Sequence, residues 1–244
     1  MKRIFYQLMT LSLCILLFSS LNGSAYAWEE GGYCGNDPIT PSVVYSFLKH
    51  FSYEQYYWGA EHQFTYNNNN RVDAMDFAYF CGHGSPWSIS VYSNGAGYGA
   101  STSIDLERAG RFSHRGYGDT DLEFIVFHSC QTIPSPRETS NWWRPWISES
   151  DDIFDRLHQA LGFRTNAYKY TAASIADYFG NRMAGNNYVW QSWFDAIDAH
   201  GDHSDNHDYG AAVMYPNAEM DRYKYSHCAD PPENHSNLRI WYQY

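Results

Sequence analysis

The sequence predicts an α/β fold, a three-layer sandwich around a mostly parallel sheet. Two short apolar runs, at 75–80 (MDFAYF) and 123–127 (EFIVF), are bounded by Gly or polar residues. Continuous apolar runs of this length are typical of strands buried on both faces. Amphipathic segments alternate with such runs along the chain. The order strand, helix, strand, helix favours parallel strands joined by helices.

The N-terminal segment has the pattern of a secretory signal peptide. Two basic residues precede a nearly unbroken apolar run at 11–18, and the sequence AYA at 25–27 fits the small-x-small cleavage rule. The apolar run is too short for a membrane-spanning helix. We therefore predict a signal peptide at 1–27, one domain at 28–244, and a secreted or periplasmic location.

The other elements follow from local patterns of helix starts, apolar spacing and stops. Residues 40–51 open with Thr and Pro and carry apolar residues at helical spacing, which predicts a capped helix. Residues 150–163 combine a Ser- and Asp-rich start with Ile153, Leu157 and Leu161 at helical spacing. Further helices are expected at 103–112, 171–184 and 188–199, and further strands at 163–168, at 210–216 and early in 87–101.

Composition and charge narrow the classes of partner. The formal net charge of −11 argues against nucleic acid or an anionic membrane as the main partner. The run 200–208 (HGDHSDNHD) is rich in His and Asp, but its spacing matches no standard metal site, so we expect a polar loop. The sequence therefore predicts a chain that is not membrane-bound after processing and that has no metal and no cofactor.

Four cysteines follow the predicted signal peptide, and an oxidising compartment would allow three disulfide pairings among them. Cys34 and Cys228 lie in loop-like sequence towards opposite ends of the chain, and chain ends often lie close together, so they are the preferred pair. Cys81 and Cys130 each follow an apolar run. They could bond to one another, or Cys81 could be a small buried hydrophobic residue.

Reactive residues follow both of the buried strands. His83 and Gly84 come after the first strand, and Cys130 comes after the second. Active sites of open α/β sheets form at the carboxyl ends of strands, so the imidazole and the thiol should meet there. To act as a nucleophile, a thiol must either be held as the thiolate or be deprotonated by such a base. The backbone N–H groups of Gly84 and Cys130 could stabilise an oxyanion by about 2.7–4 kcal/mol each. His128 should share a face with Cys130 and either tune the thiol or pack.

These motifs resemble the caspase-like cysteine peptidases, a group that includes caspases, legumain, gingipains and bacterial CHAT domains. The order is an apolar strand ending in His-Gly and then an apolar strand ending in a small residue and Cys, about 50 residues later. HSCQT at 128–132 is most similar to the CHAT form. Residues 174–198 and 210–216 resemble the helix-Gly-helix and the final core strand of CHAT domains. The resemblance covers about 75–216, whereas 28–74 and 136–146 lie outside it.

The resemblance implies a caspase-like fold and a peptidase with His83 as general acid and base and Cys130 as nucleophile. It implies an oxyanion site at the backbone of Gly84 and Cys130, and a peptide or protein substrate. Ser129 departs from the Ala that is usual in the family. The alternative is a non-catalytic binding module of the same fold, with its aromatic residues, 18% of the chain, as a carbohydrate site. A glycan hydrolase ranks last, because no Asp/Glu pair stands out.

Overall fold

The structure, a computed structural model, describes seven parts of the chain. They are residues 28–52, 54–94, 100–106, 116–147, 153–224, 228–231 and 237–244. The signal peptide predicted at 1–27 lies outside the described residues. Within the described residues, every helix is too short or too polar to cross a lipid bilayer.

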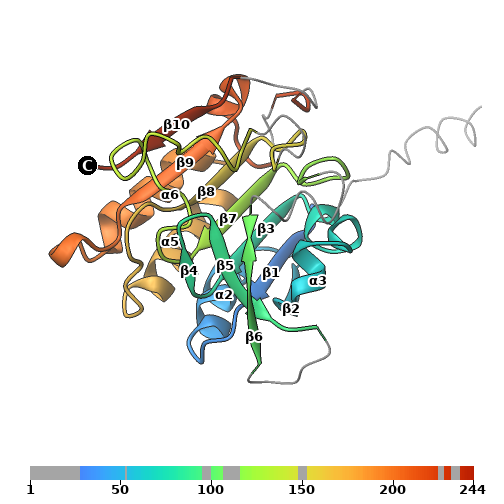
Figure 1. The fold of residues 1–244 in the computed structure, drawn as a ribbon, viewed down its shortest axis with the longest axis horizontal. Coiled ribbons are helices and arrows are strands. Elements are labelled where there is room, and N and C mark those ends of the chain that lie inside the picture. The colour runs from blue at the N-terminus through green and yellow to red at the C-terminus, as the bar shows by residue number, and fades with distance from the viewer. Residues whose placement is uncertain are drawn as a thin grey trace, which may run out of the picture.

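The centre of the molecule is a seven-stranded sheet (Figure 1). In spatial order its strands are β10 (Arg239–Tyr242), β9 (Gly210–Met214), β8 (Gln159–Phe163), β7 (Phe124–His128), β3 (Phe77–Cys81), β1 (Glu30–Cys34) and β2 (Glu54–Trp58). The block from β8 to β2 is parallel, and β9 runs antiparallel to both of its neighbours. The predicted α/β class with a mostly parallel sheet is therefore confirmed.

Three helices cover one face of the sheet, namely α2 (Thr40–Leu48), α5 (Ala172–Ala184) and α6 (Val189–His200). They confirm the helices predicted from sequence at these places. Phe47 of α2 lies at the middle of this layer. Its ring stacks on Tyr79 of β3 at a centroid distance of 4.4 Å and on Phe179 of α5 at 5.8 Å. Buried aromatic contacts of this kind hold the two helices against the sheet.

The opposite face is covered mainly by a small antiparallel sheet and short helical turns. This layer contains β4 (Gly84–Ser85), β5 (Ser88–Tyr92), β6 (Ser101–Asp105), α3 (Glu61–Phe64), η1 (Asn68–Asn70) and η2 (Val72–Ala74). Ile89, Val91 and Ile104 of the small sheet are buried with Phe64 in one apolar cluster. Two other turns, η3 (Ser204–Asn206) and η4 (Pro216–Met220), flank β9. The two outer layers therefore differ, with long helices on one side only.

The helix predicted at 150–163 is wrong. Residues 159–163 form β8, and the described residues before it, 153–158, are bends and an isolated bridge, while 150–152 lie outside the described residues. The helical spacing was misleading, because its apolar residues do not share a face. Ile153 and Leu157 are buried in the cluster beneath the small sheet, whereas Leu161 is buried beneath the helices.

Two neighbouring predictions also change. Residues 103–105, placed in a helix at 103–112, belong to strand β6, and 107–112 lie outside the described residues. The strand predicted at 163–168 ends at its first residue, because β8 stops at Phe163. The strands predicted near 75–80, 87–101, 123–127 and 210–216 are confirmed as β3, β5, β7 and β9.

The sheet is wider than the core predicted at 75–216, because β1 and β2 come from residues before it and β10 from residues after it. β1 reads EGGYC, a sequence with low strand propensity. Its glycines have a packing role. A Cβ on Gly32 would lie 2.4 Å from Val44 Cγ1, so α2 rests directly on the backbone of this strand.

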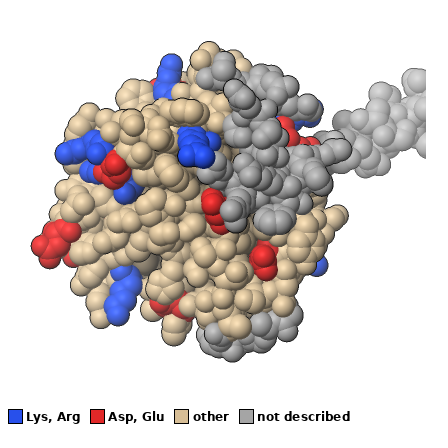
Figure 2. Space-filling view, in the orientation of Figure 1, with Lys and Arg blue, Asp and Glu red and all other residues tan. Residues whose placement is uncertain are grey.

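On the face seen in Figure 2, the described Lys, Arg, Asp and Glu side chains are scattered among uncharged residues. The net negative charge of the chain is therefore not gathered into a single patch on the visible described part of this face.

A side chain at position 180 should disturb the packing of α5 against α2. A Cβ at this position would lie 2.6 Å from the Phe47 carbonyl oxygen. Overpacking of about 1–3 kcal/mol should exceed the gain of about 1 kcal/mol in helix propensity. We expect G180A to lower the free energy of unfolding by about 1–2 kcal/mol in chemical denaturation. S174A, an exposed change on the same helix, should stay within about 0.5 kcal/mol of the parent. Equal stability of G180A and S174A would contradict the close approach.

Candidate active site

The carboxyl ends of three neighbouring strands form a row at one edge of the sheet. Cys34, the last residue of β1, is in register with Cys81, the last residue of β3, and Cys81 is in register with His128, the last residue of β7. The chain segments that leave these strands therefore start side by side. Polar residues that follow within a few positions are brought to the same edge.

A cavity of about 320 Å³ opens at this edge and collects those residues. Asp37 follows β1, His83 follows β3 and Cys130 follows β7, and all three line the cavity. The remaining lining residues are Ile39, Thr40, Cys81, Gly82, His128, Ala167, Tyr168, Lys169 and Ala172. The thiol and imidazole predicted to meet here thus share one cavity.

Asp37 is the functional candidate that the sequence interpretation missed. Its Oδ2 lies 3.1 Å from Nε2 of His83. The His83 side chain is 66% exposed and that of Asp37 is 27% exposed, so solvent screens this pair. The carboxylate can still orient the ring and fix its tautomer. The sequence interpretation missed Asp37 because it did not recognise the strand that precedes this residue.

The sulfur of Cys130 has a backbone donor beside it. The N–H of Ala167 lies 3.4 Å from Sγ and is directed at it. The neighbouring loop is held by Asp208, which is buried and accepts a hydrogen bond of 2.7 Å from the Tyr168 N–H. The His- and Asp-rich run at 200–208 therefore supports the cavity wall through this residue.

Gly84 allows the segment that carries His83 and the segment that carries Cys130 to approach closely. A Cβ on Gly84 would lie 2.8 Å from the carbonyl oxygen of Cys130 and 2.8 Å from Cβ of Ser129. Any other residue at this position would separate the segments. The Ser129 hydroxyl is hydrogen-bonded to Thr132 Oγ1 at 2.6 Å. The departure from Ala at 129 is therefore accommodated at the strand end.

Two helix N-termini also border the cavity. Thr40 is the first residue of α2, Ala172 is the first residue of α5, and both line the cavity wall. The aligned peptide dipoles place about half a positive charge at each N-terminus. A thiolate or an oxyanion in the cavity would be stabilised by these two ends.

His128 lies at the floor of the cavity and is buried. Its Nδ1 is 2.6 Å from the Tyr79 hydroxyl, and its ring packs against Phe163 and Trp193. Its Nε2 has no hydrogen-bond partner among the described residues. Burial lowers the pKa of His128 to about 3. The residue is therefore neutral at ordinary pH. Of its two predicted roles, packing agrees with these ring contacts, and the tuning of the thiol stays a prediction.

The cysteines at this edge are free thiols with different environments. Burial raises the pKa of Cys81, with smaller effects from Cys34, Asp37 and Cys130. Burial also raises the pKa of Cys34 to about 11. The structure contains no Cys81–Cys130 bond, since both residues are free. Both buried thiols stay protonated at neutral pH and are poor nucleophiles.

The predicted Cys34–Cys228 disulfide is wrong for this structure, in which both residues are free. Cys34 ends β1 at the carboxyl edge of the sheet. Cys228 lies beside His158, the residue before β8, at the amino edge. A strand of five residues separates the two edges by more than about 10 Å, beyond the Cα separation that a disulfide spans.

A family model described as "Domain of unknown function (DUF6345)" matches residues 42–243. No curated protein shows significant similarity to the chain. Among solved structures, the chain is similar to the Arg-specific cysteine proteinase gingipain R, with 8% identity, a TM-score of 0.43, and coverage of 74% of this chain and 44% of that one. A complex of the pro- and mature domains of RgpB from Porphyromonas gingivalis gives 8% identity, a TM-score of 0.40, and coverage of 72% and 44%. The chain thus spans less than half the length of these structures.

The buried imidazole of His128 should make the fold sensitive to acid. Its folded pKa of about 3 lies below the unfolded value of about 6.5, so the unfolded state binds more protons between these values. This part of the stability is complete above about pH 6.5 and is lost as the pH falls towards 3. His128→Asn keeps a partner for Tyr79 and removes the titration. We expect its unfolding free energy to fall less steeply between pH 6 and 4, by up to about 1.4 kcal/mol per pH unit.

The matched control is His200→Asn, which changes an exposed histidine. It should reproduce the parent slope in the same denaturation series. A slope for His128→Asn that equals that of the parent would show that burial of His128 does not control the acid response.

Proposed function

We propose that this chain, which belongs to the family described as domain of unknown function (DUF6345), is a cysteine peptidase that uses Cys130 and His83. One observation carries the proposal. A thiol, an imidazole and a carboxylate follow three adjacent parallel strands and line the same cavity. Nucleophilic catalysis by cysteine uses these three kinds of group, a nucleophile, a base and a third group that orients the base.

Cys130 is the nucleophile in this proposal. Its sulfur lies 3.4 Å from the backbone nitrogen of Ala167 and 3.8 Å from the Ala167 carbonyl oxygen, so the loop at Ala167 holds the thiol in place. The N-termini of α2 and α5 border the same cavity, where their positive dipole ends stabilise negative charge that develops during the reaction. These groups are part of the folded backbone, so they need no rearrangement when charge develops.

His83 carries the proton. Asp37 Oδ2 lies 3.1 Å from Nε2, and this contact favours the tautomer of the neutral ring that carries its proton on Nε2 and leaves Nδ1 to take the proton of Cys130. The exposure of the ring leaves it room to turn between the sulfur and a leaving group. Asp37 therefore acts as a positioning residue for the base.

The reaction has two stages. The thiolate attacks the peptide carbonyl carbon and forms a tetrahedral oxyanion, which collapses as the C–N bond breaks and His83 gives its proton to the amine. A thioester to Cys130 remains. Water, deprotonated by His83, then attacks the thioester and releases the carboxylic acid and the thiol. The backbone N–H groups of Gly84 and Cys130 are our candidates for the oxyanion donors, since the lack of a side chain on Gly84 keeps the segments in contact.

We further propose that the enzyme acts outside the cytoplasm and has a caspase-like fold, most similar to CHAT domains. The support for export is the basic start, apolar run and AYA sequence of residues 1–27. The support for the fold relationship is the order of the motifs at 83–84 and 128–132 on neighbouring parallel strands.

Removal of either catalytic group should abolish peptide hydrolysis. We expect Cys130→Ala and His83→Ala to lower kcat/KM to background on a panel of peptides that varies the residue before the scissile bond, measured with reductant. His200→Ala, an exposed histidine outside the cavity, should retain parental activity. Circular dichroism and thermal melting establish that each variant remains folded.

Two results would contradict the peptidase. One is peptide hydrolysis by Cys130→Ala at the parental rate. The other is a wild-type protein that cleaves none of the peptides and whose Cys130 does not react with iodoacetamide. The second result would favour the non-catalytic binding module.

Asp37→Asn tests the positioning role separately. The amide can donate to the imidazole as well as accept from it, so the tautomer is no longer fixed. We expect kcat to fall by about ten- to hundredfold with a small change in KM, because the base still lines the cavity. An unchanged kcat would remove Asp37 from the mechanism.

A further inference from the structure

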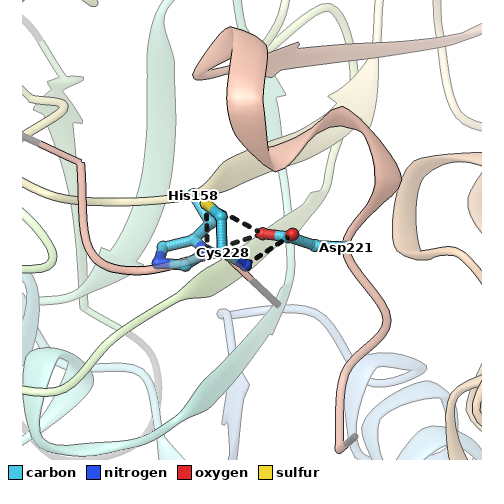
Figure 3. Close-up of side chains that lie close together, drawn as sticks. All are labelled: His158, Asp221 and Cys228. Carbon is cyan, nitrogen blue, oxygen red and sulfur yellow. Dashed lines mark hydrogen bonds and ion pairs between the residues drawn. The ribbon is translucent and has the colours of Figure 1, made fainter. Parts of the chain in front are cut away.

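A second group of potential ligands lies at the amino edge of the sheet. His158 precedes β8, Asp221 follows η4, and Cys228 lies further towards the C-terminus. Figure 3 shows the three side chains pointing toward one another from separate parts of the chain. His158 and Asp221 are buried, and Cys228 is partly buried. An imidazole, a carboxylate and a thiol thus meet away from the proposed peptidase site.

The distances within this group are close to those of a metal site. Cys228 Sγ lies 3.7 Å from His158 Nδ1 and 3.5 Å from Asp221 Oδ2. In a tetrahedral zinc site with ordinary bond lengths, S···N and S···O separations are about 3.5–3.6 Å. His158 Nδ1 and Asp221 Oδ2 are hydrogen-bonded at 2.7 Å and would have to open to about 3.4 Å. Only the separation between His158 Nδ1 and Asp221 Oδ2 has to change when zinc binds.

We propose that His158, Asp221 and Cys228 bind a zinc ion through Nδ1, Oδ2 and Sγ. Thiolate, imidazole and carboxylate are the three ligand types that zinc takes in proteins. Three protein ligands leave a fourth tetrahedral position for water. The proposal is independent of the peptidase, because the two sites lie at opposite edges of the sheet.

The surroundings of the three residues suit this role. The backbone N–H of Cys228 donates a 2.8 Å hydrogen bond to Asp221 Oδ1, which orients the carboxylate and leaves Oδ2 for the ion. Asp230 Oδ1 lies 3.9 Å from His158 Nε2, on the side of the ring away from the ion. A carboxylate at this place favours the tautomer that has its proton on Nε2 and a free lone pair on Nδ1.

Electrostatics favours a cation at the same point. The Cys228 sulfur lies 3.5 Å from Asp221 Oδ2, so a thiolate and the carboxylate at this distance would repel each other. A divalent cation bound by both groups turns that repulsion into attraction. A cavity of about 60 Å³ adjoins His158, and its lining includes Asp121, Asp230 and Arg156.

Zinc at this place would join the segment that carries Cys228 to the start of β8. The sequence contains no zinc motif here, because the ligands are 63 and 7 residues apart along the chain. The expectation of no metal rested on spacing alone. The fold brings together residues that the spacing keeps apart.

The test is metal binding by the purified chain after chelator treatment. We expect one zinc per chain by mass spectrometry of the dialysed protein. Cobalt(II) in place of zinc should give a near-ultraviolet thiolate-to-cobalt charge-transfer band and the strong visible bands of a tetrahedral site. Cys228→Ser should lose the charge-transfer band and bind zinc at least about tenfold more weakly, because even outer-shell partners contribute about 10–100-fold. Zinc in excess should raise the Tm of the parent but not of Cys228→Ser.

Cys130→Ser is the matched control, since it removes a thiol at the opposite edge. It should keep the metal, the charge-transfer band and the rise in Tm while losing peptidase activity. The proposal is overturned if the parent binds no stoichiometric zinc or shows no charge-transfer band, a result that does not depend on whether any variant folds. It is also overturned if the band survives in Cys228→Ser, or if Cys130→Ser loses it.

Discussion

The structure depends above all on the parallel, in-register pairing of β1, β3 and β7. This pairing aligns Cys34, Cys81 and His128 at one edge of the sheet. The candidate catalytic residues lie on the chain segments that follow these three strand ends. A slip of one residue in any strand would turn its side chains to the opposite face and move the following segment by about 3.3 Å. The buried aromatic contacts on both faces of the sheet hold this register.

Glycine lets the layers approach closely enough for this arrangement. Gly32 allows α2 to rest on the backbone of β1, which brings the N-terminus of α2 to the cavity. Gly84 allows the segment that carries His83 to touch the segment that carries Cys130. In both places the missing side chain sets a distance between backbones, and that distance decides which groups share the site.

The environment of each cysteine decides its chemistry. Cys130 is only partly buried and shares its cavity with His83 and with two helix N-termini. Cys228 faces the carboxylate of Asp221, which opposes a negative sulfur unless a cation is present. Cys81 is buried in the helix-covered core, and burial raises its pKa. One residue type is thereby suited to a nucleophile, a metal ligand and a packing group at three places in one fold.

The sequence alone predicted the α/β class and the two central strands, both of which the structure confirms, and it proposed the pair His83 and Cys130, which line one cavity. Continuous apolar runs and the residues just after them are local signals, and a parallel sheet brings such strand ends to one edge. The prediction of a helix in place of β8 was wrong. Ile153, Leu157 and Leu161 have helical spacing, but the first two are buried on one side of the sheet and Leu161 on the other. The sequence interpretation also missed β1, whose glycines are explained only by the helix packed on them. Tertiary structure alone decided the partnership of Asp37 with His83 and the meeting of His158, Asp221 and Cys228, because contacts between distant segments depend on strand order and leave no periodic signal in the chain.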